Sequence, residues 1–187
     1  EISISDNGRG IPIDFHPKFP DKTALEVIFC TLHAGGKFSD ENYSTSGGLH
    51  GVGISVVNAL SEKLTVNVVK NGVCYSQSFS KGVSLGKLVK IGRKRIKSGT
   101  KITFSPDKTI FSGNQFFNPE KIYELAKSKA YLFSGVTIDW KAPNIIENEL
   151  NKVPISQRFH FKNGLIDLVR SITAVEYNIT NDYFAGE

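Results

Sequence analysis

The chain has 187 residues, yet it contains no methionine, a single tryptophan and only two cysteines. Cys30 and Cys74 are too few for a disulfide framework and lack a C-x-x-C spacing, so we interpret them as reduced core thiols. No apolar run approaches the roughly 18–20 residues that a membrane-spanning helix needs, and no signal-peptide pattern opens the chain. These absences exclude disulfide-rich secreted proteins and favour a cytoplasmic protein with no membrane partner.

The ends of the chain indicate a piece of a longer protein. Besides the missing methionine, residues 1–5 already alternate apolar and polar side chains as a strand does. The last residues, 182–187, stop without a closing element. A hydrophobic fraction of 40% is enough for one core in a chain of this length. We therefore expect one domain whose N-terminal part is missing, alone or with the edge of a second domain.

Acidic residues are absent from one stretch of the chain, 81–101, although the net charge of the whole is only +5. Eight bases occupy this stretch: Lys81, Lys87, Lys90, Arg93, Lys94, Arg95, Lys97 and Lys101. They form either the solvated rim of a hairpin or a surface that contacts a phosphate backbone. No aromatic residue lies among them, which argues against a stacking platform for single strands.

The hydrophobic periodicity predicts both helices and strands. A period of two predicts strands near 2–5, 64–68, 73–79, 88–91, 100–104, 136–140 and 159–161, with a hairpin turn at Asn71-Gly72. A helical period predicts helices near 23–32, 54–60, 118–133 and 168–172. The second of these is apolar nearly all round and should be buried; the third should pack through Ile122, Leu125, Ala126, Leu132 and Phe133. We predict an α+β fold: a two-layer sandwich of helices on a mixed, mainly antiparallel sheet.

A glycine cluster stands directly before the second predicted helix, at Gly47, Gly48, Gly51 and Gly53. Glycines let a backbone approach a ligand closely, and a helix start offers unpaired N–H groups that suit phosphate. The spacing fits neither a dinucleotide fingerprint nor a Walker loop. A loop that only needs flexibility before a tightly packed helix is the competing interpretation.

Asp6 ends the first predicted strand and is followed by Gly8 and Gly10. A carboxylate can accept a hydrogen bond from the exocyclic amine of adenine, whereas guanine presents an oxygen at that position. Gly10 would leave room for the flat base. The alternative is an Asx turn that stabilises only the local Asp6-Asn7-Gly8 sequence.

Four segments together resemble the ATPase domain of bacterial type IIA DNA topoisomerases, the family of gyrase and topoisomerase IV B subunits. They are residues 6–12 (DNGRGIP), 32–38 (LHAGGKF), 46–53 (SGGLHGVG) and 98–100 (SGT). Residues 54–61 and the insertion Arg93-Lys94-Arg95 incline the resemblance towards the topoisomerase IV branch. The resemblance implies a GHKL-type ATPase fold over residues 1–173 and the start of the transducer domain at 174–187.

The resemblance also implies a role for particular positions. Asp6 would bind the adenine amine, with Gly10 beneath the base and Thr100 assisting. Lys37 would reach the phosphates, and Tyr43 would touch the nucleoside. The backbone that would wrap the phosphates comprises Gly48, Leu49, His50, Gly51, Val52, Gly53 and Ile54. ATP and Mg²⁺ are the implied cofactors.

The catalytic base of the family, a Glu, and its magnesium ligand, an Asn, belong to a helix that would precede this chain. We therefore expect no catalytic residue and no metal ligand within it, and negligible hydrolysis by the chain alone. The implied partners are double-stranded DNA, the topoisomerase A subunit and a second copy of the ATPase domain. The implied location is the cytoplasm, at the bacterial nucleoid.

Three other functions stay open at this point. A MutL-type repair ATPase and a histidine kinase share the nucleotide chemistry, and a non-catalytic module would bind DNA through the stretch 81–101.

Overall fold

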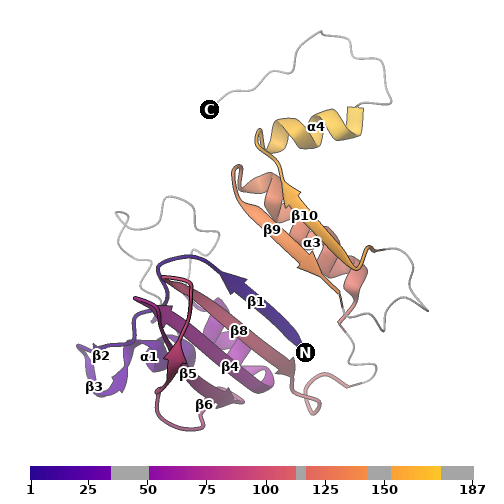
Figure 1. Cartoon of the computed structure of the whole chain (residues 1–187). Helices are drawn as coiled ribbons and strands as arrows, with labels where there is room; N and C mark the ends of the chain where they lie inside the picture. The colour runs from indigo at the N-terminus through magenta and orange to yellow at the C-terminus, as the bar shows by residue number, and fades with distance from the viewer. Residues whose placement is uncertain (35–50, 113–116, 143–152, 174–187) are drawn as a thin grey trace. The chain divides into compact units, whose positions relative to one another are not determined.

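The computed structural model describes residues 1–34, 51–112, 117–142 and 153–173. Contacts divide the chain into two compact units, Glu1–Phe116 and Phe117–Glu187 (Figure 1). The first unit contains a six-stranded sheet, and the second contains a two-stranded hairpin with two helices. The predicted domain boundary at 173/174 adjoins residues outside the described ones and stays a prediction.

The sheet of the first unit runs in the order β1-β8-β4-β5-β6, and β7 also pairs with β5. Its strands are β1 (Ile2–Asp6), β4 (Ser61–Lys70), β5 (Val73–Ser80), β6 (Val83–Ser84), β7 (Val89–Arg93) and β8 (Gly99–Pro106). Every pairing between these strands is antiparallel. Asn71 and Gly72 turn β4 into β5 with φ of 50° and 75°, as a two-residue hairpin of the predicted kind requires. The predicted mainly antiparallel sheet is confirmed.

The helix α1 (Ala24–Cys30) follows the small hairpin of β2 (Phe15–His16) and β3 (Phe19–Thr23). The hydroxyl of Thr23 caps it by accepting a hydrogen bond from the Glu26 amide at 3.2 Å. The helix ends earlier than residue 32, because Thr31 has an extended backbone with φ −126° and ψ 131°. Leu32 consequently lies 59% exposed and is not part of the core.

The helix α2 (Gly53–Ala59) is less buried than its apolar sequence predicts. Its buried residues are the polar Ser55 and Asn58, whereas Val56 is 41% exposed. Asn58 donates a hydrogen bond from Nδ2 to the carbonyl of Phe29 at 3.0 Å and so ties α2 to α1. The prediction that α2 is buried was wrong. The helix turns the amide side chain of Asn58 into the core, and this orientation leaves Val56 exposed.

The core of the first unit lies between α1, α2 and one face of the sheet. Six fully buried side chains form its centre: Leu25, Phe29, Leu64, Val66, Val68 and Phe79. The rings of Phe29 and Phe79 stack with their centroids 5.1 Å apart. Both cysteines are free thiols, and burial raises the pKa of the Cys30 thiol.

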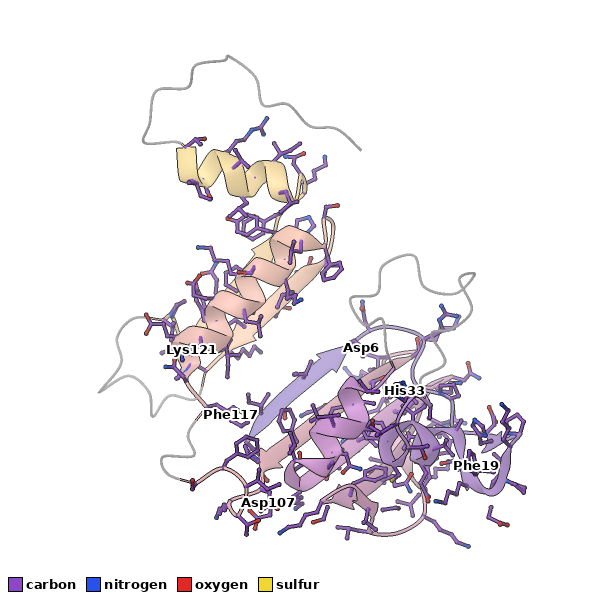
Figure 2. The ribbon with its side chains drawn as sticks, turned by 180° about the vertical axis from the view of Figure 1, so that it is seen from behind. Asp6, Phe19, His33, Asp107, Phe117 and Lys121 are labelled. Atoms are coloured by element: carbon purple, nitrogen blue, oxygen red, sulfur yellow. The ribbon has the colours of Figure 1, made fainter. Side chains whose placement is uncertain are left out.

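Asp107 fixes the far end of β8, at the end of the sheet opposite Asp6 (Figure 2). Its carboxylate is 3.0 Å from the Lys81 ammonium and accepts hydrogen bonds from the amide and hydroxyl of Thr109 at 2.9 and 2.8 Å. Its amide donates to the carbonyl of Leu60 at 2.9 Å. The Thr109 amide, Lys81 and the Thr109 hydroxyl hold the pKa of Asp107 below its usual value.

In the second unit, the helix α3 (Pro119–Leu132) begins at Asn118, whose side chain accepts a hydrogen bond from the Lys121 amide at 3.1 Å. It packs on the hairpin of β9 (Thr137–Lys141) and β10 (Ser156–His160), which leads to α4 (Leu165–Thr173). The predicted packing face was partly wrong, because Leu125 and Leu132 are 57% and 55% exposed. Tyrosines supply the contacts instead. Tyr123 meets the edges of Trp140 and Phe159, and Tyr131 stacks on Phe161.

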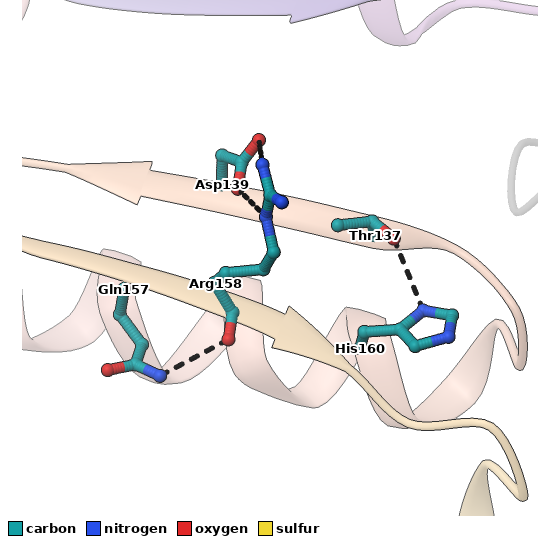
Figure 3. Close-up of polar contacts among 5 residues, drawn as sticks. All are labelled: Thr137, Asp139, Gln157, Arg158 and His160. Atoms are coloured by element: carbon teal, nitrogen blue, oxygen red, sulfur yellow. Dashed lines mark hydrogen bonds and ion pairs between the residues drawn. The ribbon is translucent and has the colours of Figure 1, made fainter.

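Polar side chains pair across one face of the β9–β10 hairpin (Figure 3). Arg158 donates to both carboxylate oxygens of Asp139, at 2.6 and 3.0 Å, and this lowers the pKa of Asp139. Thr137 and His160 are hydrogen-bonded at 3.2 Å on the same face. The ion pair is mostly exposed and so contributes little to stability. Among the described residues, no helix is both long and apolar enough to cross a membrane.

A core truncation tests the packing of the first unit. Leu64→Ala removes a side chain with 0% exposure, so we expect the free energy of unfolding to fall by about 2–5 kcal/mol. The matched control Leu85→Ala alters a leucine that is 64% exposed and should change stability by less than about 0.5 kcal/mol. Urea unfolding measures both, and equal losses would contradict this core.

Acid titration tests the role of Asp107. Because its pKa is lowered in the folded state, its stabilising contribution is present above the unfolded pKa, roughly 4, and is lost as the pH falls through the folded value. We therefore expect Asp107→Asn to lower the melting temperature at pH 7, with the difference from the parent narrowing below about pH 4. Asp21→Asn, on the exposed β3, is the control. A difference that is constant with pH would refute the charge-based account.

Candidate functional site

Asp6 is the last residue of β1 and is the antiparallel partner of Thr100 at the start of β8. Its Oδ1 accepts hydrogen bonds from the Gly8 amide at 2.9 Å and from the Thr100 amide at 3.3 Å. The first of these is the predicted Asx turn, and the second joins the carboxylate to the sheet. Within the described part of the chain no hydrogen bond reaches Oδ2. One oxygen therefore holds the exposed side chain in place, and within these residues the other is left as an acceptor.

Gly10 brings the loop after β1 back against the sheet. Its φ is +75°, and a Cβ at this position would lie 3.0 Å from the carbonyl oxygen of Val69 and 3.1 Å from Cγ1 of Val68. Val68 is in turn the partner of Thr100 across β4 and β8. Asp6 and Gly10 are thus brought together with Thr100, which is about 90 positions further along the sequence, at one end of the sheet.

Gly99 lies at the same end of the sheet, next to Asp6, although the sequence analysis assigned it no role in the site. A Cβ there would clash with the backbone oxygen of Asp6, and φ is +154°. Only glycine lets β8 begin this close to the end of β1. The signal was present in the Ser98-Gly99-Thr100 motif, but the contact with Asp6 spans 93 positions of sequence and depends on strand pairing.

The described part of the predicted phosphate loop is Gly51, Val52, Gly53 and Ile54. Gly51 has φ of +62°, and Val52 precedes α2 without a side-chain cap, so the residue at the cap position leaves the first amides of the helix without a side-chain partner of its own. A Cβ at Gly53 would meet nothing within 4 Å. Ile54 and Ile11 both pack on the core cluster, so the two loops border the same core.

Five predicted site residues lie outside the described residues: Lys37, Tyr43, Gly48, Leu49 and His50. In the described ranges there is also no group of three or more His, Cys, Asp or Glu side chains that could hold a metal ion. The described residues therefore form only part of the predicted site: Asp6 with Gly10 and Thr100, and the start of α2.

Comparisons with known proteins show the family to which the chain is similar. Residues 1–110 match the family model of the histidine kinase-, DNA gyrase B- and HSP90-like ATPases. Similar curated proteins include the B subunit of DNA topoisomerase 4 from Rickettsia felis, 54% identical over 99% of this chain and 28% of that protein. The B subunit of DNA gyrase from Campylobacter jejuni is 42% identical over 92% of this chain and 21% of that protein. The chain thus spans about a quarter of the length of the first of these relatives and about a fifth of the second.

A solved structure is similar as well. The 43K ATPase domain of Thermus thermophilus gyrase B, in complex with an aminocoumarin, superposes with a TM-score of 0.75 at 32% identity. The match covers 96% of this chain and 42% of that one. The predicted GHKL-type fold is confirmed, and so is the resemblance to the type IIA topoisomerase ATPases. With its first 110 residues matching the family model, the chain belongs to the histidine kinase-, DNA gyrase B- and HSP90-like ATPase family.

Proposed function

We propose that the chain binds ATP through Asp6 and forms the nucleotide-binding part of a type IIA DNA topoisomerase B subunit. The observation that carries the proposal is the carboxylate of Asp6, which among the described residues is held by the Gly8 and Thr100 amides through Oδ1 alone. The other oxygen is then an acceptor at a fixed position, as recognition of the adenine amine requires. Gly99 lets β8 begin against the backbone of Asp6, and Gly10 lets the following loop lie against Val68 and Val69.

The phosphate-binding role of residues 48–54 is supported by the family resemblance and by the uncapped start of α2. The proposal includes Mg²⁺ because this ion is usually bound together with the phosphates of a nucleotide. The described residues include no group of three or more His, Cys, Asp or Glu side chains that could hold the ion. Lys37 and Tyr43 complete the proposed site from residues outside the described ranges.

The proposal extends to the whole protein through its relatives. The topoisomerase 4 B subunit of R. felis is 54% identical, compared with 42% for the gyrase B subunit of C. jejuni, which favours the topoisomerase IV branch. The protein would then couple ATP hydrolysis to the passage of double-stranded DNA, unlinking daughter chromosomes or changing supercoiling. Its partners would be the topoisomerase A subunit and a second ATPase domain, at the nucleoid in the bacterial cytoplasm.

Replacement of one oxygen by an amide tests the recognition of adenine. Asp6→Asn makes the acceptor ambiguous, so we expect ATP affinity to fall by at least about tenfold, since hydrogen bonds to charged groups contribute roughly 1.5–3 kcal/mol. The preference for ATP over GTP should narrow, because an amide can donate to the guanine oxygen. Titration calorimetry with both nucleotides measures this, and Asp21→Asn is the control. Unchanged affinity and selectivity would refute the assignment.

The close approach of β1 and β8 gives a second test. Gly99→Ala places a methyl group on the Asp6 carbonyl and must displace the end of β1, so we expect weaker ATP binding together with lower stability. Gly86→Ala is the matched control, because a Cβ there meets nothing within 4 Å. If both variants bind ATP like the parent, Gly99 does not position Asp6.

A further inference from the structure

The sheet of the first unit has two different faces. Helices α1 and α2 pack on one of them, and no helix of the described part of this unit lies on the other (Figures 1 and 2). The side chains on this second face, which we call the open face, alternate along each strand with those of the core. We call a row of side chains that are neighbours across adjacent strands a rung. Asp6, Thr100 and Val68 form one rung, and it lies on the same face as the core side chains. The open face therefore takes no part in the nucleotide site.

The open face is polar from strand to strand. Its first rung runs across β1, β8, β4 and β5 through Ser5, Lys101, Asn67 and Ser76, each the antiparallel partner of the next. Ser5 and Lys101 are exposed, and the other two are half-buried. This rung therefore presents two hydroxyls, one amide and one ammonium group to solvent.

The second rung consists of hydroxyls alone. Ser3, Thr103, Thr65 and Ser78 follow one another across the same four strands. The Ser3 and Thr103 hydroxyls are 2.7 Å apart, and those of Thr65 and Ser78 are 3.3 Å apart. A third rung adds Lys63 and Ser105, which are partners of each other. On these four strands none of the side chains in these rungs is acidic, aliphatic or aromatic. The face is not polar throughout, because the partner of Ser76 on β7 is the exposed Val89 and the next rung towards the β4–β5 turn is the buried pair Val69 and Cys74.

The basic stretch borders this face at one end. The amide of Lys94 donates to the carbonyl of Gly72 at 2.8 Å, and the amide of Gly72 donates to the carbonyl of Lys97 at 3.0 Å. These bonds hold the exposed β7–β8 loop beside the β4–β5 turn. The bases there are Arg93 at the end of β7 and Lys94, Arg95 and Lys97 in the loop. Lys81 is not part of this group, because it forms an ion pair with Asp107.

The chemistry and size of this surface fit a nucleic acid duplex. Hydroxyls, amides, lysines and arginines are the groups that contact phosphate and sugar in such complexes. Four strands about 4.8 Å apart and a strand rise of about 3.3 Å give a polar area roughly 14 by 13 Å from Lys63 to Asn67. The length is about two-fifths of a helical turn of B-DNA. The rungs carry no aromatic side chain on which single-stranded bases could stack.

We propose that the open face, together with the β7–β8 loop, is a docking surface for the phosphate backbone of double-stranded DNA. The rungs supply hydrogen-bonding groups at strand spacing, and the loop supplies positive charge at the border. The contact is with the backbone and does not depend on base sequence. It shares with the proposed function only the identity of the partner, and it uses the opposite face of the sheet from the nucleotide site.

The decisive measurement is the salt dependence of duplex binding by the chain. Fluorescence anisotropy with a mixed-sequence duplex of about three helical turns gives the slope of log K against log salt. Each lysine that contacts a phosphate contributes about 0.9 to this slope. We expect the double substitution K63Q/K101Q to weaken binding roughly tenfold near 0.1 M salt and to reduce the slope by about 2.

The matched control is K18Q/K22Q, which removes the same charge from two exposed lysines of the β2–β3 hairpin. It should leave affinity and slope unchanged. A second variant, T65V/T103V, keeps the charge and the β-branched shape but removes two hydroxyls of the face. It should weaken binding several-fold with no change in slope, and circular dichroism checks that each variant is folded.

Several results would overturn the proposal. These are an equal loss in the K18Q/K22Q control, single strands binding as tightly as the duplex, or no loss in either face variant. The β7–β8 region also exposes Val89, Ile91 and Ile96. Tighter binding to vesicles with anionic lipids than to the duplex would therefore make this a membrane surface instead. Calorimetry with ATP on the same variants distinguishes a failure of the docking surface from a failure of the ATP site. K63Q/K101Q should bind ATP like the parent.

Discussion

The pairing of β1 with β8 is the constraint on which the rest of this structure depends. It places the carboxylate of Asp6 beside the amide of Thr100, a residue 94 positions away in the sequence. The pairing can only close because Gly99 has no side chain where it meets the carbonyl of Asp6. Gly10 then lets the following loop lie against Val68 and Val69 of β4. An exposed acidic residue becomes a fixed acceptor because three strands and two glycines hold it there.

The sheet that carries this acceptor separates two kinds of chemistry. Its inner face is filled by side chains such as Phe29 and Phe79, and the rung of Asp6, Thr100 and Val68 continues that face to the end of the sheet. Most of its outer face is made of hydroxyls, an amide and lysines, with the buried pair Val69 and Cys74 between these groups and a basic loop. Because strand side chains alternate, one set of strands can serve a small ligand on one side and a large charged partner on the other.

Much of the fold was predictable from local sequence signals. The Asn71-Gly72 turn, the Asn118 cap and the alternating strands follow from backbone preferences that act within a few residues. The errors occurred where packing decides. Leu125 faces solvent while Tyr131 is buried, and α2 turns Asn58 inward and Val56 outward, because aromatic contacts and a hydrogen bond to Phe29 orient these helices. Periodicity cannot anticipate such choices, since it counts apolar residues and not their partners.

The sequence by itself determined which groups this protein could use: a carboxylate at a strand end, glycines on either side of it, a glycine-rich loop before a helix and a stretch of bases without acids. Tertiary structure alone decided which of these groups meet. Strand register joined Asp6 to Thr100 and made Gly99 indispensable to that contact, and it gathered scattered serines and threonines into the rungs of one face. The reason is physical: a residue's chemistry is local, whereas its neighbours across a sheet are set by hydrogen bonds between distant segments.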